Sequence, residues 1–309
     1  MKPQSFVKSL ENFYVVKPLN PFKSRVKYMT SFKLAINPYR GCPYKCVYCY
    51  IYGYTRMSDI RYPASRKLFK RRLRRDIREY ARLGLPKYPV YLSPSCEPLH
   101  PFLENRYGNT LYALKTLKEE GFPVIISTKN PSRLLREEYL EALDRKSTTI
   151  HISVPFLDNR FEPNASLPIG RIWAASKLVK EGLTVYIRVE PIIPSYGAIA
   201  GQSKMELKTI VKEARKAGVY DIISKCLLLS IGVSKVYPSF YKELKPYYLR
   251  HGYSDGTYYM LDYNTRIRLL MPLYKACRRN NVRLWTQIND LPFSETPSCN
   301  ELESLTYFR

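Results

Sequence analysis

The amino-acid sequence predicts an α/β protein built around a partial (βα)6 barrel. Short runs rich in β-branched residues alternate with longer amphipathic stretches between about residues 37 and 236. Glycines stand at the ends of several of these stretches, just before the next run. Such alternation is typical of parallel strands joined by crossover helices. The strand-like runs number about six, fewer than the eight of a closed barrel.

The expected elements follow one another along the chain. Strands are expected near 33–37 and at 90–92, 124–127, 149–154, 184–189 and 222–231. Helical stretches are expected at 66–82, 108–120, 132–145, 169–181 and 203–217. Residues 1–36, which are polar, basic and aromatic, predict an irregular N-terminal arm, followed by the barrel at 37–236. Residues 237–309 predict a tyrosine-rich C-terminal extension, with a helix at about 265–280 and an apolar run at 282–288.

Composition and charge narrow the class of protein. The 309 residues are 45% hydrophobic, enough for a sizeable core, and no stretch resembles a membrane span or a signal-peptide core. A cytoplasmic protein is therefore the simplest interpretation. Fifty-one Lys and Arg against 26 Asp and Glu leave a net charge of +25, which favours polyanionic partners such as DNA or RNA. The alternative is a charge-rich surface of the thermophilic kind, but this predicts acids and bases in closer balance.

Three of the seven cysteines, Cys42, Cys46 and Cys49, lie within eight residues. Clustered cysteines in a cytosolic chain favour metal binding over disulfides. Thiolates are the ligands that iron–sulfur clusters require, and three of them leave one iron of a 4Fe–4S cluster open for chemistry. A structural zinc site is the alternative, but it needs four ligands, and none of the three histidines is next to the triad.

The spacing Cys-x3-Cys-x2-Cys, with an aromatic residue before the last cysteine, resembles the radical S-adenosylmethionine (SAM) superfamily. Residues 37–42 (Asn-Pro-Tyr-Arg-Gly-Cys) and 48–50 (Tyr-Cys-Tyr) resemble the branch that includes spore photoproduct lyase. The resemblance runs from about residue 36 to about 197. It implies a partial barrel of the radical SAM type, a 4Fe–4S cluster and SAM as cofactors, and an electron donor such as ferredoxin or flavodoxin. One electron then cleaves SAM to methionine and a 5′-deoxyadenosyl radical, which abstracts hydrogen from a substrate.

The resemblance also implies cofactor contacts at consecutive strand ends. Glu97 matches the acid of a Gly-Gly-Glu-Pro motif that holds the cofactor's ammonium, although serine and cysteine replace both glycines. Lys129 would meet the cofactor's carboxylate, Ser153 matches a serine that contacts the cofactor, and Arg188 would reach the carboxylate or the ribose. Tyr48 would lie over the cluster. The alternative for the two cations is structural pairing. A further motif, Arg160 to Pro163 with Arg171, also matches the branch, without a role that follows from it.

Cys96 is a candidate hydrogen donor. Spore photoproduct lyase uses a cysteine near this strand end to return a hydrogen atom to its substrate radical, assisted by two tyrosines that correspond to Tyr48 and Tyr50. The alignment, however, places that cysteine at Pro94 rather than at Cys96. The alternative for Cys96 is a small buried thiol.

Residues 66–82 predict a strongly basic helix with one apolar face, formed by Phe69, Leu73, Ile77 and Tyr80. Its position after the cysteine loop favours a place near the active-site mouth and contact with phosphates, with a solvated surface as the alternative. The tyrosines of the extension are candidate stacking platforms for bases, or packing residues. The candidate phosphate ligands are Arg71, Arg72, Arg74, Arg75 and Arg78.

Three functions agree with these features. The leading hypothesis is a radical enzyme, lyase-like or nucleic-acid-modifying, that repairs or modifies DNA or RNA. A second hypothesis keeps the radical chemistry and gives it a small molecule or a peptide. A third is a non-catalytic nucleic-acid-binding protein with a structural cluster, which predicts four protein ligands and no cleavage of SAM.

Overall fold

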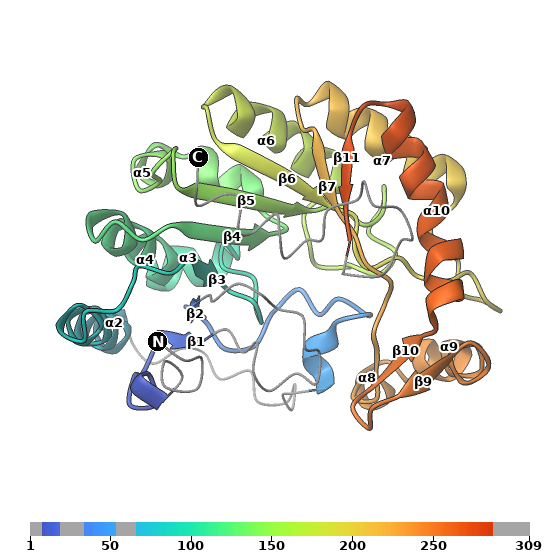
Figure 1. Ribbon diagram of the computed structural model, residues 1–309, viewed down its shortest axis with the longest axis horizontal. Helices are drawn as coiled ribbons and strands as arrows, with labels where there is room; N and C mark the ends of the chain where they lie inside the picture. Colours follow the sequence, from blue (N-terminus) through green and yellow to red (C-terminus); the bar gives the residue numbers. More distant parts are fainter. Residues whose placement is uncertain (1–7, 19–33, 54–65, 287–309) are drawn as a thin grey trace.

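The computed structural model describes residues 8–18, 34–53 and 66–286, which form an α/β fold around one large sheet (Figure 1). The strand order is β1-β2-β3-β4-β5-β6-β7-β11. In this sheet, β2 to β7 and β11 pair in parallel with their neighbours, whereas β1 is antiparallel to β2. The strands are β1 (Lys17–Pro18), β2 (Leu34–Ile36), β3 (Val90–Leu92), β4 (Val124–Thr128), β5 (Thr148–Ser153), β6 (Thr184–Arg188), β7 (Asp221–Ile223) and β11 (Arg283–Trp285). The predicted α/β class is confirmed, and β11 adds a seventh parallel strand to the six expected.

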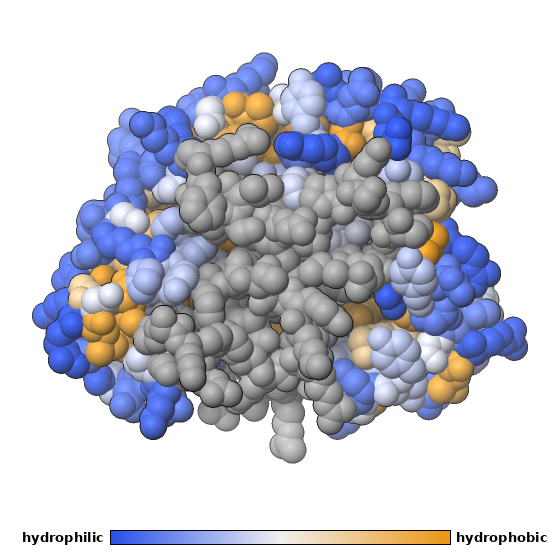
Figure 2. Space-filling view, viewed as in Figure 1, coloured by the Kyte–Doolittle hydropathy of each residue, from blue (hydrophilic) through white to orange (hydrophobic). Residues whose placement is uncertain are grey.

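Helices cover one face of the sheet, and their outer surfaces are largely hydrophilic (Figure 2). They are α2 (Arg66–Arg82), α3 (Pro101–Tyr107), α4 (Asn109–Glu119), α6 (Pro168–Lys180), α7 (Lys204–Lys216) and α10 (Tyr263–Arg279). The helix expected at 132–145 is instead a 3-10 turn, η2 (Pro131–Leu135), and a short α5 (Glu137–Leu140), because Arg136 between them is extended. The four glycines expected to end helices all have positive φ angles, and these are Gly84, Gly121, Gly182 and Gly218.

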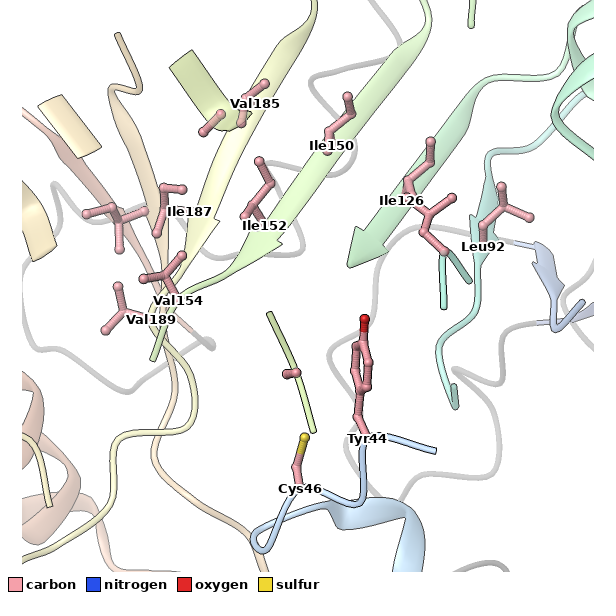
Figure 3. Close-up of a cluster of buried hydrophobic side chains, with 14 of the residues drawn as sticks. Tyr44, Cys46, Leu92, Ile126, Ile150, Ile152, Val154, Val185, Ile187 and Val189 are labelled. Carbon is pink, nitrogen blue, oxygen red and sulfur yellow. The ribbon is translucent and has the colours of Figure 1, made fainter. Parts of the chain in front are cut away.

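The two faces of the sheet differ in chemistry. Leu92, Ile126, Ile150 and Ile187 lie on the helix-covered face and belong to one buried cluster with residues of α4, α6 and α7 (Figure 3). The other face carries larger and more polar side chains. There Arg188 of β6 donates a hydrogen bond of 3.0 Å to the hydroxyl of Tyr91 on β3. Three strand spacings, roughly 14 Å in a flat sheet, separate these strands, so the two long side chains reach toward each other across β4 and β5.

The N-terminal arm is tied to α2 through one buried carboxylate. Asp76, only 1% exposed, accepts hydrogen bonds from the backbone N–H groups of Tyr14, Val15 and Val16 at 2.5–3.0 Å. This contact places β1 beside β2, so the arm that was expected to be irregular contributes a strand. The predicted apolar face of α2 is confirmed, because Phe69, Leu73, Ile77 and Tyr80 are all buried.

The C-terminal part forms a second, small sheet and then returns to the large one. The run expected as one strand at 222–231 is divided between β7 and β8 (Leu229–Ser230), which lie in different sheets. The small sheet has the order β8-β10-β9, with β9 (Gly252–Ser254) and β10 (Tyr258–Leu261), and carries α8 (Val233–Val236) and α9 (Pro238–Arg250). The division of the chain at residue 237 stays a prediction. β11 pairs across it with β7, and α10 packs on α7.

In the described part of the chain, no helix combines the length and the apolar character needed to cross a lipid bilayer.

Candidate active site

The cysteine loop follows β2 directly and lies at the carboxyl ends of the parallel strands, where ligands gather in folds of this kind. Figure 3 shows Tyr44 and Cys46 beyond the ends of β4 and β5. The loop is fixed from two sides. The backbone N–H of Val47 donates to the carbonyl of Phe161 at 2.9 Å, and the hydroxyl of Tyr237 donates to the carbonyl of Lys45 at 2.6 Å.

The three cysteines of the loop form a set of thiols that fits an iron–sulfur cluster. All three are free, and they lie close enough for each thiol to raise the pKa of another. Burial is the main cause that raises the pKa of Cys42, Cys46 and Cys49 to about 12, and a bound iron–sulfur cluster would supply the positive charge that stabilises their thiolates. Among the described residues, no three His, Cys, Asp or Glu side chains converge on a single metal ion. A 4Fe–4S cluster does not need this, since each thiolate binds a different iron.

Glu97 lies in the loop that follows β3 and is held by residues at the end of β4. Its carboxylate accepts hydrogen bonds from the backbone N–H groups of Leu99 at 3.1 Å and Lys129 at 2.8 Å, and from the hydroxyl of Thr128. Burial raises the pKa of Glu97 in spite of these donors. A carboxylate has about four acceptor sites, so one remains for a further donor such as an ammonium group. The predicted contact with the cofactor's ammonium stays a prediction that this geometry permits.

Glu162 is the centre of a buried polar network that sequence reasoning did not interpret. It is 1% exposed and accepts hydrogen bonds from the hydroxyl of Tyr48 and from Nη1 of Arg171 at 2.5 Å. Nζ of Lys129 lies 3.6 Å from the same carboxylate. Arg171 also donates to the carbonyl of Ser153 at 2.9 Å. The network therefore joins the cysteine loop, the end of β4, the end of β5 and α6.

These contacts bring two predicted cofactor ligands, Tyr48 and Lys129, against one carboxylate and link a third, Ser153, to it through Arg171. Burial disfavours the charge of Lys129, but the nearby Glu162 and Cys46 outweigh it and raise the pKa of this amine. Glu162 and Arg171 belong to a motif that resembles the spore photoproduct lyase branch in sequence, but the resemblance implied no role for it. Its role needed the fold, because the partners lie on four separate segments.

Arg188 is the centre of a second polar group, on the sheet face opposite the helices. Its guanidinium donates to Glu190 at 2.7 Å and to the Tyr91 hydroxyl at 3.0 Å, and its Nη1 lies 3.0 Å from Nδ1 of His151. Arg188 is therefore paired with other side chains of the protein, as the alternative of structural pairing expected. Its predicted contact with the cofactor stays a prediction. Sequence reasoning missed Tyr91, His151 and Glu190. The signal was available, because the polar alternation Thr149-His151-Ser153 is unusual for a buried parallel strand.

Tyr50 and Cys96 both lie close to the cluster loop but have different neighbours. The hydroxyl of Tyr50 donates to the carbonyl of Pro94, the position that aligns with the lyase cysteine. The thiol of Cys96 lies 3.2 Å from the carbonyl oxygen of Tyr39 and 3.4 Å from Oγ of Ser93. Burial raises the pKa of Cys96 to about 12. The thiol therefore keeps its proton at neutral pH, as a hydrogen-atom donor requires.

Replacement of Cys96 by alanine is expected to leave SAM cleavage intact and to lower the yield of product per 5′-deoxyadenosine formed. The reason is that the substrate radical would lose the S–H bond that returns its hydrogen atom. The assay uses any candidate substrate that stimulates SAM cleavage and quantifies both compounds by chromatography. Cys226→Ala, which removes a buried thiol near α10, serves as the matched control. An unchanged product yield in Cys96→Ala would assign this thiol to packing.

The basic helix α2 lies at the β1–β2 side of the molecule and packs on α4 (Figure 1). Arg72 is half-buried, whereas Arg71, Arg74, Arg75 and Arg78 are exposed. The guanidinium groups of Arg72 and Arg75 lie 5.1 and 4.4 Å from the ring centre of Tyr14. The predicted contact of this face with phosphates stays a prediction.

Comparison with known proteins agrees with the site. Residues 36–187 match the family model of the radical SAM superfamily. No curated protein matches the chain in sequence. A mutant of spore photoproduct lyase has a similar structure, with a TM-score of 0.61 and 17% identity over 81% of this chain and 75% of that one.

Two further structures extend the likeness. A spore photoproduct lyase mutant with bound AdoMet and dinucleoside spore photoproduct gives a TM-score of 0.61 at 16% identity, over 81% of this chain and 75% of that one. Streptococcus suis SuiB bound to its precursor peptide SuiA gives 0.52 at 19% identity, and the match covers 82% of this chain but 48% of SuiB. At these identities the likeness concerns the fold, and at that level the resemblance to the spore photoproduct lyase branch is confirmed. With the family match and the three clustered thiols, it shows that the chain belongs to the radical SAM superfamily, whose enzymes use a 4Fe–4S cluster and S-adenosylmethionine.

Proposed function

We propose that this radical SAM enzyme acts on a nucleic acid, either repairing a lesion or modifying a base. The observation that carries the proposal is the net charge of +25 together with its concentration on one exposed helix face. The cofactors supply the 5′-deoxyadenosyl radical, and the chain supplies the site that holds them. Cys42, Cys46 and Cys49 would hold the cluster, and Glu97 and Lys129 would bind the ammonium and the carboxylate of SAM.

The outer face of α2 is more uniformly positive than its composition suggests. Asp76 points inward to the N-terminal arm, and Glu79 pairs with Arg82 at 2.7 Å. Tyr14, which is 51% exposed, lies against two of the arginines and adds an aromatic surface. A helix of 17 residues is about 25 Å long, so this face is long enough to follow several phosphates of a backbone.

The tyrosines of the C-terminal part divide between the two roles considered for them. Tyr241, Tyr248 and Tyr258 are buried around the small sheet, and the hydroxyl of Tyr258 donates to the carbonyl of Tyr50 at 3.1 Å. Tyr253 and Tyr263 are 56% and 41% exposed, which leaves these two as candidates for stacking with unpaired bases. A spore photoproduct lyase structure contains a dinucleoside photoproduct, which supports a dinucleoside-sized substrate for this fold.

Neutralising the exposed arginines of α2 is expected to weaken binding to nucleic acid about 10²–10³-fold at low salt. Each lost phosphate contact should reduce the slope of log K against log[salt] by roughly 0.9 on duplex DNA. The measurement is fluorescence anisotropy with labelled 20-nucleotide single-stranded DNA, duplex DNA and RNA between about 50 and 200 mM salt. The variant combines Arg71→Gln, Arg74→Gln, Arg75→Gln and Arg78→Gln.

The matched control removes four exposed lysines from α6 and α7, through Lys180→Gln, Lys204→Gln, Lys208→Gln and Lys212→Gln. The two variants have the same net charge, so only a local phosphate site separates them. Equal losses of nucleic-acid affinity in the two variants would mean that the positive charge acts through a general electrostatic effect and not through a local site on α2. If wild-type protein binds none of the three probes and none of them stimulates SAM cleavage, the substrate is a peptide or small molecule. SuiB, whose structure contains a peptide, has a related fold.

A further inference from the structure

The small sheet and its helices touch the cysteine loop from a distant part of the chain. This sheet, with α8 and α9, lies at the lower right of Figure 1. The hydroxyl of Tyr258 in β10 donates to the carbonyl of Tyr50 at 3.1 Å. The hydroxyl of Tyr237, which precedes α9, donates to the carbonyl of Lys45 at 2.6 Å. Residues that come 208 and 192 positions later therefore hold both ends of the segment that carries the second and third clustered cysteines.

The bond from Tyr237 holds a peptide group that Cys46 shares. The carbonyl of Lys45 and the N–H of Cys46 belong to the same planar unit, so holding the oxygen also restricts the backbone at Cys46. Lys45 has a φ angle of +48°, a left-handed conformation that is uncommon outside glycine and that persists where surrounding contacts hold it. The ring of Tyr237 also packs edge to face on Tyr52, with ring centres 6.0 Å apart. Loss of the Tyr237 hydroxyl should therefore let the turn before Cys46 relax.

A second contact lies just after the last cysteine, where two backbones meet closely at η1 (Tyr50–Gly53). A Cβ on Gly232, at the start of α8, would overlap the carbonyl oxygen of Tyr52. Gly232 has a φ angle of −63°, which any residue adopts, so the close approach and not the backbone conformation calls for glycine. A Cβ on Gly53 would lie 2.9 Å from Oγ of Ser230 in β8. The small sheet and α8 are thus packed directly against the chain that leaves the cysteine loop.

A cluster held by three thiolates depends on the shape of the loop that carries them. Three cysteines bind three of the four irons, so the protein holds the cluster through this loop. A loop that becomes ordered only when the cluster binds loses conformational freedom at that moment, and this cost weakens the binding. Contacts that order the loop beforehand remove part of the cost.

We propose that Tyr237 and Tyr258 are positioning residues that keep the cysteine loop in the shape that retains the cluster. Gly232 contributes by allowing α8 to approach η1. We call Tyr237, Tyr258 and Gly232 the loop anchors. No covalent bond is made or broken in this role. The proposal goes beyond the function proposed above, because it concerns retention of the cluster and is independent of the substrate that the radical attacks.

The first test measures how fast the reconstituted full chain releases iron to an excess of ferrozine under anaerobic conditions. Tyr237→Phe and Tyr258→Phe each remove one hydroxyl and keep the ring. Each variant should release iron about 5-fold faster than wild type, which is the scale of one hydrogen bond. The double variant should release it about 25-fold faster, since the two bonds lie on different segments of the small domain.

Matched controls separate the loop anchors from folding stability in general. Tyr248→Phe removes a bond of 2.7 Å from a tyrosine of α9 to the carbonyl of Leu227, away from the loop. Tyr248 is fully buried, so this variant should lose at least as much stability, measured by the urea midpoint of the apoprotein, and yet release iron at the wild-type rate. Gly232→Ala should accelerate release, whereas Gly170→Ala in α6, where a Cβ meets open space, should not.

Trypsin gives a readout that needs no cluster. It cleaves the bond between Lys45 and Cys46, whose carbonyl oxygen accepts the Tyr237 bond. Lys45 is exposed, so opening of its backbone and not burial of its side chain should limit this cut. In the apoprotein, Tyr237→Phe should be cut at this bond several-fold faster than wild type or Tyr248→Phe. Mass spectrometry of fragments that begin at Cys46 measures the rate.

Two results would overturn the proposal. One is iron release at the wild-type rate in both Tyr237→Phe and Tyr258→Phe. The other is equal acceleration in Tyr248→Phe, because the effect would then follow folding stability alone. Oligonucleotide binding plays no part in either measurement, so this proposal and the nucleic-acid proposal fail separately. Faster release and faster cleavage in the anchor variants, with the controls at the wild-type rate, would establish the role.

Discussion

Replacing Cys42 with alanine is expected to reduce SAM cleavage to the background level. A 4Fe–4S cluster with one open iron needs three thiolates, one for each of the other irons. The two cysteines that remain in the variant leave a second iron without a protein ligand. The measurement is anaerobic reconstitution followed by iron and sulfide determination. Dithionite and SAM are then added, and 5′-deoxyadenosine is quantified by chromatography. Cys46→Ala and Cys49→Ala should behave in the same way.

The matched control is Cys277→Ala, which removes a buried thiol from α10 and leaves the loop untouched. This variant should keep both its cluster and its activity. Cleavage by Cys42→Ala at the wild-type rate would show that the cluster is held elsewhere. A full wild-type cluster that never cleaves SAM, even with nucleic acid present, would favour the non-catalytic alternative.

Replacing Arg171 with methionine is expected to cost about 3–5 kcal/mol of folding free energy. The side chain is fully buried, and its removal leaves the carboxylate of Glu162 buried without its strongest partner. Two carbonyl oxygens, those of Ser153 and Ser166, also lose a donor. The unfolding midpoint of the apoprotein in urea reports the loss.

Two controls separate the buried charge from the loss of an ion pair in general. Arg145→Met removes the exposed pair with Glu181 and should cost no more than about 1 kcal/mol. The double variant Arg171→Met, Glu162→Gln removes both charges and should recover part of the loss. If Arg171→Met is no less stable than Arg145→Met, the buried network does not hold the cysteine loop.

The placement of the candidate site residues near strand ends could be predicted from the sequence because it depends on local residues. The three cysteines lie in one loop, Lys129, Ser153 and Arg188 end a strand or follow one directly, and Glu97 lies in the loop after β3. The parallel order of the strands follows from the alternation of short strands and crossover helices. These features need no knowledge of distant contacts, and the family match and the fold confirm the class to which they point.

The features that the sequence did not predict depend on contacts between distant segments. Glu162 meets Tyr48, which is more than 100 residues away, and such a pairing leaves no periodic pattern. The sequence shows Asp76 as an ordinary surface acid of a charged helix, although it binds the backbone of the N-terminal arm. The strand β11 is too short to signal its place beside β7. Tyrosine occurs in both cores and surfaces, so the sequence does not predict which tyrosines of the C-terminal part are buried.

The pairing of β11 with β7 has a consequence for the order in which the protein matures. About 240 residues separate the cysteine loop from the last parallel strand, and at 5–20 residues per second a ribosome needs roughly 10–50 s to make them. During that interval the nascent chain has its three thiols but an incomplete sheet. The contacts that hold the loop, from Val47 to Phe161 and from Tyr237 to Lys45, also form only during that interval, and until then the thiols are open to oxidation.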